Sequence, residues 1–153
     1  MLNRLSHFVD KDTLARIYLG FILPRLEYAC ALWCGGGNTD KIVKLQKKFC
    51  RRHGIDIVSL NVHFSYHTLL LFYQIKSKIS SMYLSSVLPR SLKESSCYNL
   101  RKTVYPVPIL NRQSSFKSFY PRAVILWNSL PQYVQVSASL AVFKKRLAAH
   151  LNM

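Results

Sequence analysis

Residues 40–54 read DKIVKLQKKFCRRHG, and this stretch predicts a single helix with two opposite faces. At about 100° per residue, its cationic side chains fall within an arc of about 140°. These cations are Lys41, Lys44, Lys47, Lys48, Arg51 and Arg52. Ile42, Leu45 and Phe49 lie on the other side, which we expect to pack against the rest of the chain. Gly54 is expected to end the helix, because glycine readily adopts the left-handed conformation found at helix ends.

The residues before this helix also show helical spacing of apolar side chains. Asp10 or Asp12 is expected to cap a helix that Pro24 interrupts or restarts. A second short helix is predicted over residues 26–33, and the glycines at 35–37 stop it.

The remainder of the chain predicts further helices and one linker. Residues 55–63 fit either a short strand or a loop. Helices are expected over residues 64–80, 81–88 and 118–127, and from Ser137 or Ser139 onward. The expected fold class is mostly α. It comprises an irregular helical bundle over residues 1–89, a Pro- and Ser-containing extended linker over 90–115, and two C-terminal helices within 116–153.

Large aromatic side chains on the apolar stripes of these helices are predicted to form the core. They are Trp33, Phe49, Trp127 and Phe143. The alternative for the two tryptophans is stacking on nucleobases, but their places on apolar stripes favour packing.

The chain of 153 residues is strongly basic, with 22 Lys and Arg against 6 Asp and Glu and a formal net charge of +16. Glu94 is the last carboxylate, and no acid lies between Lys41 and Arg52. A solvated helix face usually alternates Glu with Lys four residues apart, so the repulsion here favours a phosphate partner. The pattern predicts contacts with the backbone of RNA or DNA. An anionic membrane surface is the alternative partner, because basic amphipathic helices also bind such surfaces.

Several motifs stand in order along the chain. They are the segment Leu14–Trp33, Leu45-Gln46-Lys47-Lys48, Phe72-Tyr73-Gln74-Ile75-Lys76, Tyr83-Leu84 with Leu88-Pro89, and Leu126-Trp127-Asn128-Ser129-Leu130-Pro131 followed by Ser139-Leu140-x-x-Phe143-Lys144. In this order they resemble the region that follows the polymerase palm in reverse transcriptases of non-LTR retrotransposons. The jockey and CR1-like LINE families are the most similar.

The resemblance implies the thumb and post-thumb region of an RNA-directed DNA polymerase, present as a fragment or a truncated copy. It also implies that the palm and fingers of a longer polymerase are a partner. Nothing in the chain matches the palm's Tyr-x-Asp-Asp motif, whose paired aspartates hold the two catalytic metal ions. We therefore expect no catalytic residue, no metal and no cofactor, and no enzymatic activity from this chain. A catalytically inert structural remnant that needs the missing palm is the alternative.

The cysteines and histidines suggest two weaker interpretations. Cys30, Cys34, Cys50 and His53 have a spacing compatible with zinc ligands. However, Cys30 lies on an apolar stripe, where a free cysteine packs as a small hydrophobic residue. No acid is placed in the sequence to orient a histidine for nucleophilic catalysis. The glycines at 35–37 lack the Lys-Ser/Thr ending of a phosphate-binding P-loop.

The sequence also indicates where the protein works. No apolar run approaches the roughly 18 residues that a membrane span needs, and the N-terminus lacks the apolar region of a signal peptide. Four cysteines are too few for a disulfide scaffold of this length. We expect a soluble intracellular protein in the cytoplasm or the nucleus.

Overall fold

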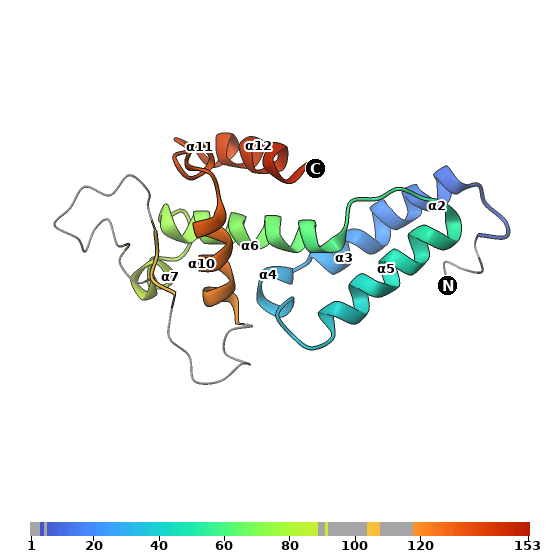
Figure 1. Ribbon diagram of the computed structural model, residues 1–153, viewed down its shortest axis with the longest axis horizontal. Coiled ribbons are helices and arrows are strands. Elements are labelled where there is room, and N and C mark those ends of the chain that lie inside the picture. Colours follow the sequence, from blue (N-terminus) through green and yellow to red (C-terminus); the bar gives the residue numbers. More distant parts are fainter. Residues whose placement is uncertain (1–3, 5, 89–90, 92–103, 108–117) are drawn as a thin grey trace.

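The computed structural model describes residues 4, 6–88, 91, 104–107 and 118–153 (Figure 1). Within these residues the regular structure is helical, which confirms the mostly α fold class. The elements are α2 Lys11–Ile17, the π-helical segment η1 Tyr18–Ile22, α3 Leu23–Glu27, α4 Cys30–Trp33, α5 Thr39–His53, α6 Leu60–Lys76, α7 Met82–Val87, α10 Phe119–Ser129, α11 Gln132–Gln135 and α12 Leu140–Leu151.

The first helix continues through Pro24 because its hydrogen bonding changes before the proline. The side chain of Asp10 caps α2 by accepting a hydrogen bond from the Thr13 N–H at 3.2 Å, as predicted for this residue. The π-helical segment η1 then leads into α3, and the Leu23 N–H bonds back to the Tyr18 carbonyl. Pro24 falls in the first turn of α3, where a missing N–H costs no hydrogen bond.

The predicted short helix over residues 26–33 is wrong, because the chain turns sharply within it. The first helix ends at Glu27, and Ala29 takes a left-handed conformation with φ of 50°. Only Cys30–Trp33 forms the next helix, α4. Alanine rarely adopts this conformation, so its side chain gives no sequence signal for the turn.

The ambiguous stretch before α6 is also resolved. Residues 55–59 have no regular structure, and α6 begins at Leu60 rather than at residue 64. It ends at Lys76, before the predicted end at residue 80. The structure also forms the short helix α11 between the two predicted C-terminal helices, where the sequence pattern predicts none.

One core lies between the N-terminal helices and the start of α6. Figure 1 shows α5 running alongside the first helix, and the rings of Tyr18 and Phe49 stack with their centroids 5.4 Å apart. Phe49 and Trp33 are partly buried against this core. Trp33 packs edge-on against Phe64 and donates its indole N–H to the Tyr28 carbonyl at 2.9 Å. The buried members are Tyr18, Leu23, Cys30, Cys34, Val43, Leu60 and Phe64.

The second core lies between the later turns of α6 and the C-terminal helices. Trp127 and Phe143 are fully buried there, and both contact α6 through Phe72 and Tyr73. The hydroxyl of Ser139 caps α12 by accepting a hydrogen bond from the Val142 N–H at 3.3 Å, as predicted. The helix α6 therefore contributes residues to both cores, which matches its apolar composition on every side.

Most of the predicted linker over residues 90–115 lies outside the described residues. Its described part includes Tyr105, which is buried against the second core. The backbone N–H and carbonyl of Tyr105 both bond to the side-chain amide of Asn128, at 3.0 and 2.9 Å. This pair of bonds fixes the extended residues 104–107 to α10. The proposed division of the chain at residues 89 and 116 stays a prediction.

Candidate nucleic-acid interface

Only one narrow side of the helix α5 packs against the other described helices. Val43 and Gln46 are its buried residues, whereas Ile42 and Phe49 are only partly buried. Leu45 was predicted to pack with the latter two, and this is wrong because its side chain is 66% exposed. The N-terminal helices therefore cover only part of the apolar side of α5, and Leu45 lies beyond their edge.

The six predicted nucleic-acid contacts all lie on the open side of α5. Each of them is exposed: Lys41, Lys44, Lys47, Lys48, Arg51 and Arg52. Among the described residues, no carboxylate forms an ion pair with any of these six side chains. We call this set the basic face. Its charges are unneutralised by the protein, so they are available to an external anion.

Within residues 40–56, the two acids stand at the two ends of the basic face. Asp40 occupies the first turn of α5, where a carboxylate stabilises the positive end of the helix dipole. Asp56 follows the end of the helix, and both carboxylates are exposed. The arginines in the last turn balance the negative end of the same dipole.

A buried glutamine positions the basic face relative to the rest of the molecule. The side-chain amide of Gln46 donates to the Val58 carbonyl at 2.9 Å and accepts from the Leu60 N–H at 2.8 Å. These two bonds join the middle of α5 to the loop that leads into α6. The sequence analysis does not identify Gln46 as a buried residue, because glutamine side chains are mostly exposed in folded proteins.

An acid does lie against two histidines, which corrects the expectation from the sequence. The Glu27 carboxylate is 2.6 Å from Nδ1 of His63 and 3.4 Å from Nε2 of His67. The two histidines are four residues apart on α6, so they share one face of that helix. Glu27 lies 36 residues before His63, and only tertiary packing brings them together. This cluster joins α3 to α6.

The cysteines of the suggested zinc set are mostly buried. Burial, with a smaller effect from the neighbouring Cys34, raises the pKa of the Cys30 thiol to about 12. A thiol with this pKa stays protonated at neutral pH and packs as an apolar group, whereas zinc binds the thiolate. Across the described ranges, no group of three or more His, Cys, Asp or Glu side chains is placed to hold a metal ion.

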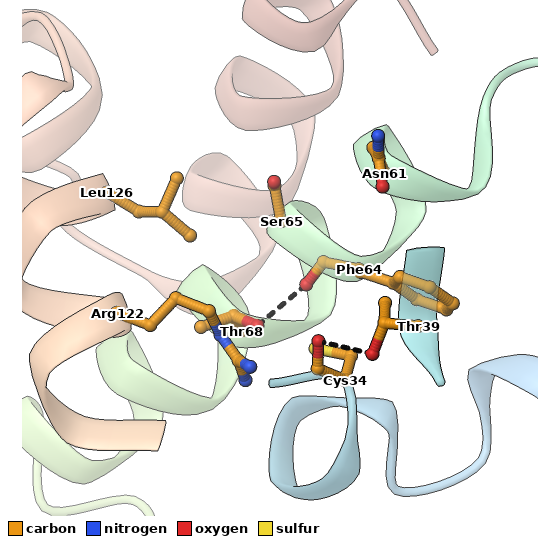
Figure 2. A pocket seen from close by; sticks show the side chains of 8 residues that line it. All are labelled: Cys34, Thr39, Asn61, Phe64, Ser65, Thr68, Arg122 and Leu126. Atoms are coloured by element: carbon orange, nitrogen blue, oxygen red, sulfur yellow. Dashed lines mark hydrogen bonds between the residues drawn. The ribbon is translucent and has the colours of Figure 1, made fainter. Parts of the chain in front are cut away.

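A small pocket of about 160 Å³ lies where α10 meets α4 and α6, and Figure 2 shows its lining. Arg122 extends from α10 into this space and donates to the Ala31 carbonyl at 2.5 Å. The hydroxyls of Thr68 and Thr39 point into the pocket, but they already donate to backbone carbonyls of Phe64 and Cys34. The Arg122 bond therefore joins α10 to α4, whereas the Thr68 bond lies within α6.

A larger apolar hollow of about 310 Å³ borders the basic face, and we call it the apolar groove. It lies between the first helix and α5. Its lining residues are Tyr18, Ile22, Leu26, Ile42, Leu45, Gln46, Phe49 and Leu60. The exposed Leu45 lines this groove and lies next to Lys41 and Arg52 around the helix axis, so the groove adjoins the basic face.

The cationic side chains of α12 differ in whether they form hydrogen bonds within the protein. Arg146 donates to the carbonyls of Tyr133 and Val136, at 2.6 and 3.1 Å, and thereby holds α11 against α12. Lys144 and Lys145 are exposed and form no such bonds. The open positive charge at the C-terminus is thus smaller than on α5.

Comparisons of the chain with protein-family models, with curated proteins and with solved structures find no match. Among the described helices, none is both long enough and apolar enough to cross a membrane. The case for a function therefore depends on the geometry and charge of this chain's own residues.

Proposed function

We propose that the basic face of α5 binds the phosphate backbone of RNA or DNA. One observation carries the proposal: six exposed cations share one side of a helix, and none has a carboxylate partner among the described residues. Like charges at this spacing destabilise a helix, and bound phosphates relieve that repulsion. The positions are held by the packing of Val43 and by the two hydrogen bonds of Gln46.

The affinity of such a surface arises mainly from the release of condensed counterions. If about three to five of the cations each neutralise one phosphate of a single strand, log K falls against log salt with a slope of about −2 to −3.5. Contacts with phosphates carry no sequence information, so the affinity should vary little with base composition. Fluorescence anisotropy of a labelled single strand at several salt concentrations measures both quantities. A slope near zero contradicts the proposal.

We further propose that the chain is the thumb and post-thumb region of a non-LTR retrotransposon reverse transcriptase, and that it performs no chemistry alone. Support comes from the ordered motifs described above and from the lack of a Tyr-x-Asp-Asp sequence. Without paired aspartates no metal ions are held to activate the primer hydroxyl. Primer extension on an RNA template, with Mg²⁺ or Mn²⁺, tests this part. Extension by rigorously purified protein contradicts it.

A structural role that depends on a missing partner is the second candidate function. It is favoured by large apolar side chains that stay exposed, among them Phe21, Tyr28, Met82 and Tyr83. Such residues are common at surfaces that are buried in a larger assembly. Light scattering of the purified chain, with and without RNA, separates the candidates. Aggregation that RNA does not relieve, together with no RNA binding, supports the structural role. Selective binding to anionic vesicles instead indicates a membrane surface.

A further inference from the structure

We propose that the apolar groove receives an unpaired nucleobase and that the protein therefore selects single strands over duplexes. This inference depends on the proposed function, because it assumes that phosphates lie along the basic face. It adds a second contact, made to the base, that the backbone contacts alone do not supply.

The position of the groove relative to the cations is the first argument. On a helix with about 100° per residue, Leu45 lies about 20° from Arg52 and about 40° from Lys41 around the axis. Lys48 lies about 60° from Leu45 on the same side. On a regular helix these three cations form a row beside Leu45, which lines the groove, and the row extends about 16 Å along α5. A strand whose phosphates follow this row has its bases next to the groove.

The row of three cations also favours one kind of ligand over others. A small anion such as a fatty acid carries one charge and engages one cation at a time. A linear chain of regularly spaced charges engages all three, and it can direct an apolar group from each repeat toward the groove. A nucleic acid strand has this combination of charges and flat apolar faces. Sites that bind single strands commonly pair a basic track with apolar and aromatic surfaces for the bases.

The size and lining of the groove suit a base. Its volume of about 310 Å³ falls near the lower end of the range for small-ligand sites. Ile22, Leu26 and Leu45 supply aliphatic side chains, and Phe49 supplies the ring that stacks on Tyr18. Leu45 is 66% exposed, so a base can enter from the side of the cations without displacing buried residues.

Duplexes lack this contact because their bases are already paired and stacked. To reach the groove, a base in a duplex must first be extruded, and that step opposes binding. The phosphates of a duplex remain able to contact the basic face. We therefore expect a duplex to bind by charge alone and a single strand to bind by charge and by base insertion.

The experiment compares three labelled DNA probes by fluorescence anisotropy with the full chain. They are an oligothymidylate of about 12 nucleotides, which is within the usual site sizes, its duplex with oligoadenylate, and an abasic strand with the same number of phosphates. We expect the oligothymidylate to bind about tenfold more tightly than the abasic strand, as one inserted base contributes. The two single strands should have equal salt slopes, because their phosphates are the same.

Two variants connect this difference to the groove. Leu45→Ala removes one wall and should reduce the preference for the oligothymidylate severalfold, whereas Leu32→Ala is the matched control. Leu32 is also 66% exposed, but it lies on α4 and does not line the groove.

Three results of these measurements would overturn the proposed base site. Equal affinity for the oligothymidylate and the abasic strand overturns the base site while leaving the phosphate contacts in place. A preference that survives unchanged in Leu45→Ala places the base elsewhere and also overturns the proposal. Failure of all three probes to bind overturns the proposed function together with this inference.

Discussion

The side chain of Gln46 accepts a hydrogen bond from the backbone N–H of Leu60 at 2.8 Å, in a buried position. The same amide donates to the Val58 carbonyl at 2.9 Å. A single side chain of α5 thus satisfies two backbone groups just before and at the start of α6. It fixes the rotation of α5, and the rotation decides which residues form the basic face.

Replacing this glutamine should destabilise the protein. Gln46→Ala leaves the Leu60 N–H without a partner in a buried site, and the expected cost is about 1–3 kcal/mol. The free energy of unfolding is measured with urea, and Lys47→Ala serves as the control on the exposed side. A cost equal to that of the control would mean that water or the backbone replaces the amide.

Trp127 should contribute to stability and not to nucleic-acid affinity. It is fully buried, with its ring 5.2 Å from Phe72 and 5.9 Å from Phe143. Trp127→Ala is expected to cost about 3–5 kcal/mol of unfolding free energy. Tyr133→Ala, which truncates an aromatic residue that is 55% exposed, should change stability by less than about 0.5 kcal/mol.

The milder variant Trp127→Phe separates packing from base stacking. It keeps an aromatic ring in the core, so the fold should persist for binding measurements. Anisotropy should give the same affinity for a single strand as the native chain. Weaker binding by a stably folded variant would show that the tryptophan contacts nucleic acid.

The stability of the protein should decrease at high pH because of Tyr18. Burial raises the pKa of its hydroxyl from 10.0 to about 12, with a smaller effect from Cys50. Between pH 10.0 and about pH 12 the unfolded chain loses this proton and the folded chain keeps it, so the free energy of unfolding falls as the pH rises. Below pH 10 both states hold the proton, and this group causes no change with pH.

Tyr18→Phe isolates that effect from the titration of the lysines. Thermal denaturation is measured at several pH values from 9 to 12 for both proteins, below and across the interval set by the two pKa values. The decrease in stability should be smaller in the variant. Parallel curves would mean that the hydroxyl ionises as easily in the folded state as in the unfolded state.

Reversing two charges on the basic face should weaken nucleic-acid binding and its dependence on salt. Lys44→Glu combined with Lys48→Glu removes about two phosphate contacts, so the salt slope should become less negative by about 1.4. The fold should survive, because both side chains are exposed. Circular dichroism measures the helix content beside the anisotropy.

A second double variant tests whether location matters beyond total charge. Lys144→Glu with Lys145→Glu gives the same change in net charge at exposed positions of α12. This variant should keep most of the salt slope. If both pairs reduce the slope equally, binding depends on the overall charge and not on the basic face.

The sequence predicted α5 and the exposure of its cations well, because both follow from one short periodic pattern. It failed for Leu45, since helical periodicity shows which side is apolar but not how far the neighbouring helix extends over it. The break at Ala29 was missed because its left-handed backbone has no residue signature. The contact of Glu27 with His63 depends on packing between distant segments, which no local pattern encodes.

The helix α6 contributes residues to both cores, and this has a consequence for the synthesis of the protein. Its residues leave the ribosome well before α10–α12, which complete the second core. Translation adds about 5–20 residues per second. The side of α6 that carries Leu69, Phe72 and Tyr73 is therefore exposed for several seconds before the helices that cover it have been synthesised. A nascent chain of this kind exposes apolar surface to chaperones and to other nascent chains. Its yield in a cell should therefore depend on translation speed, even where the finished protein is stable.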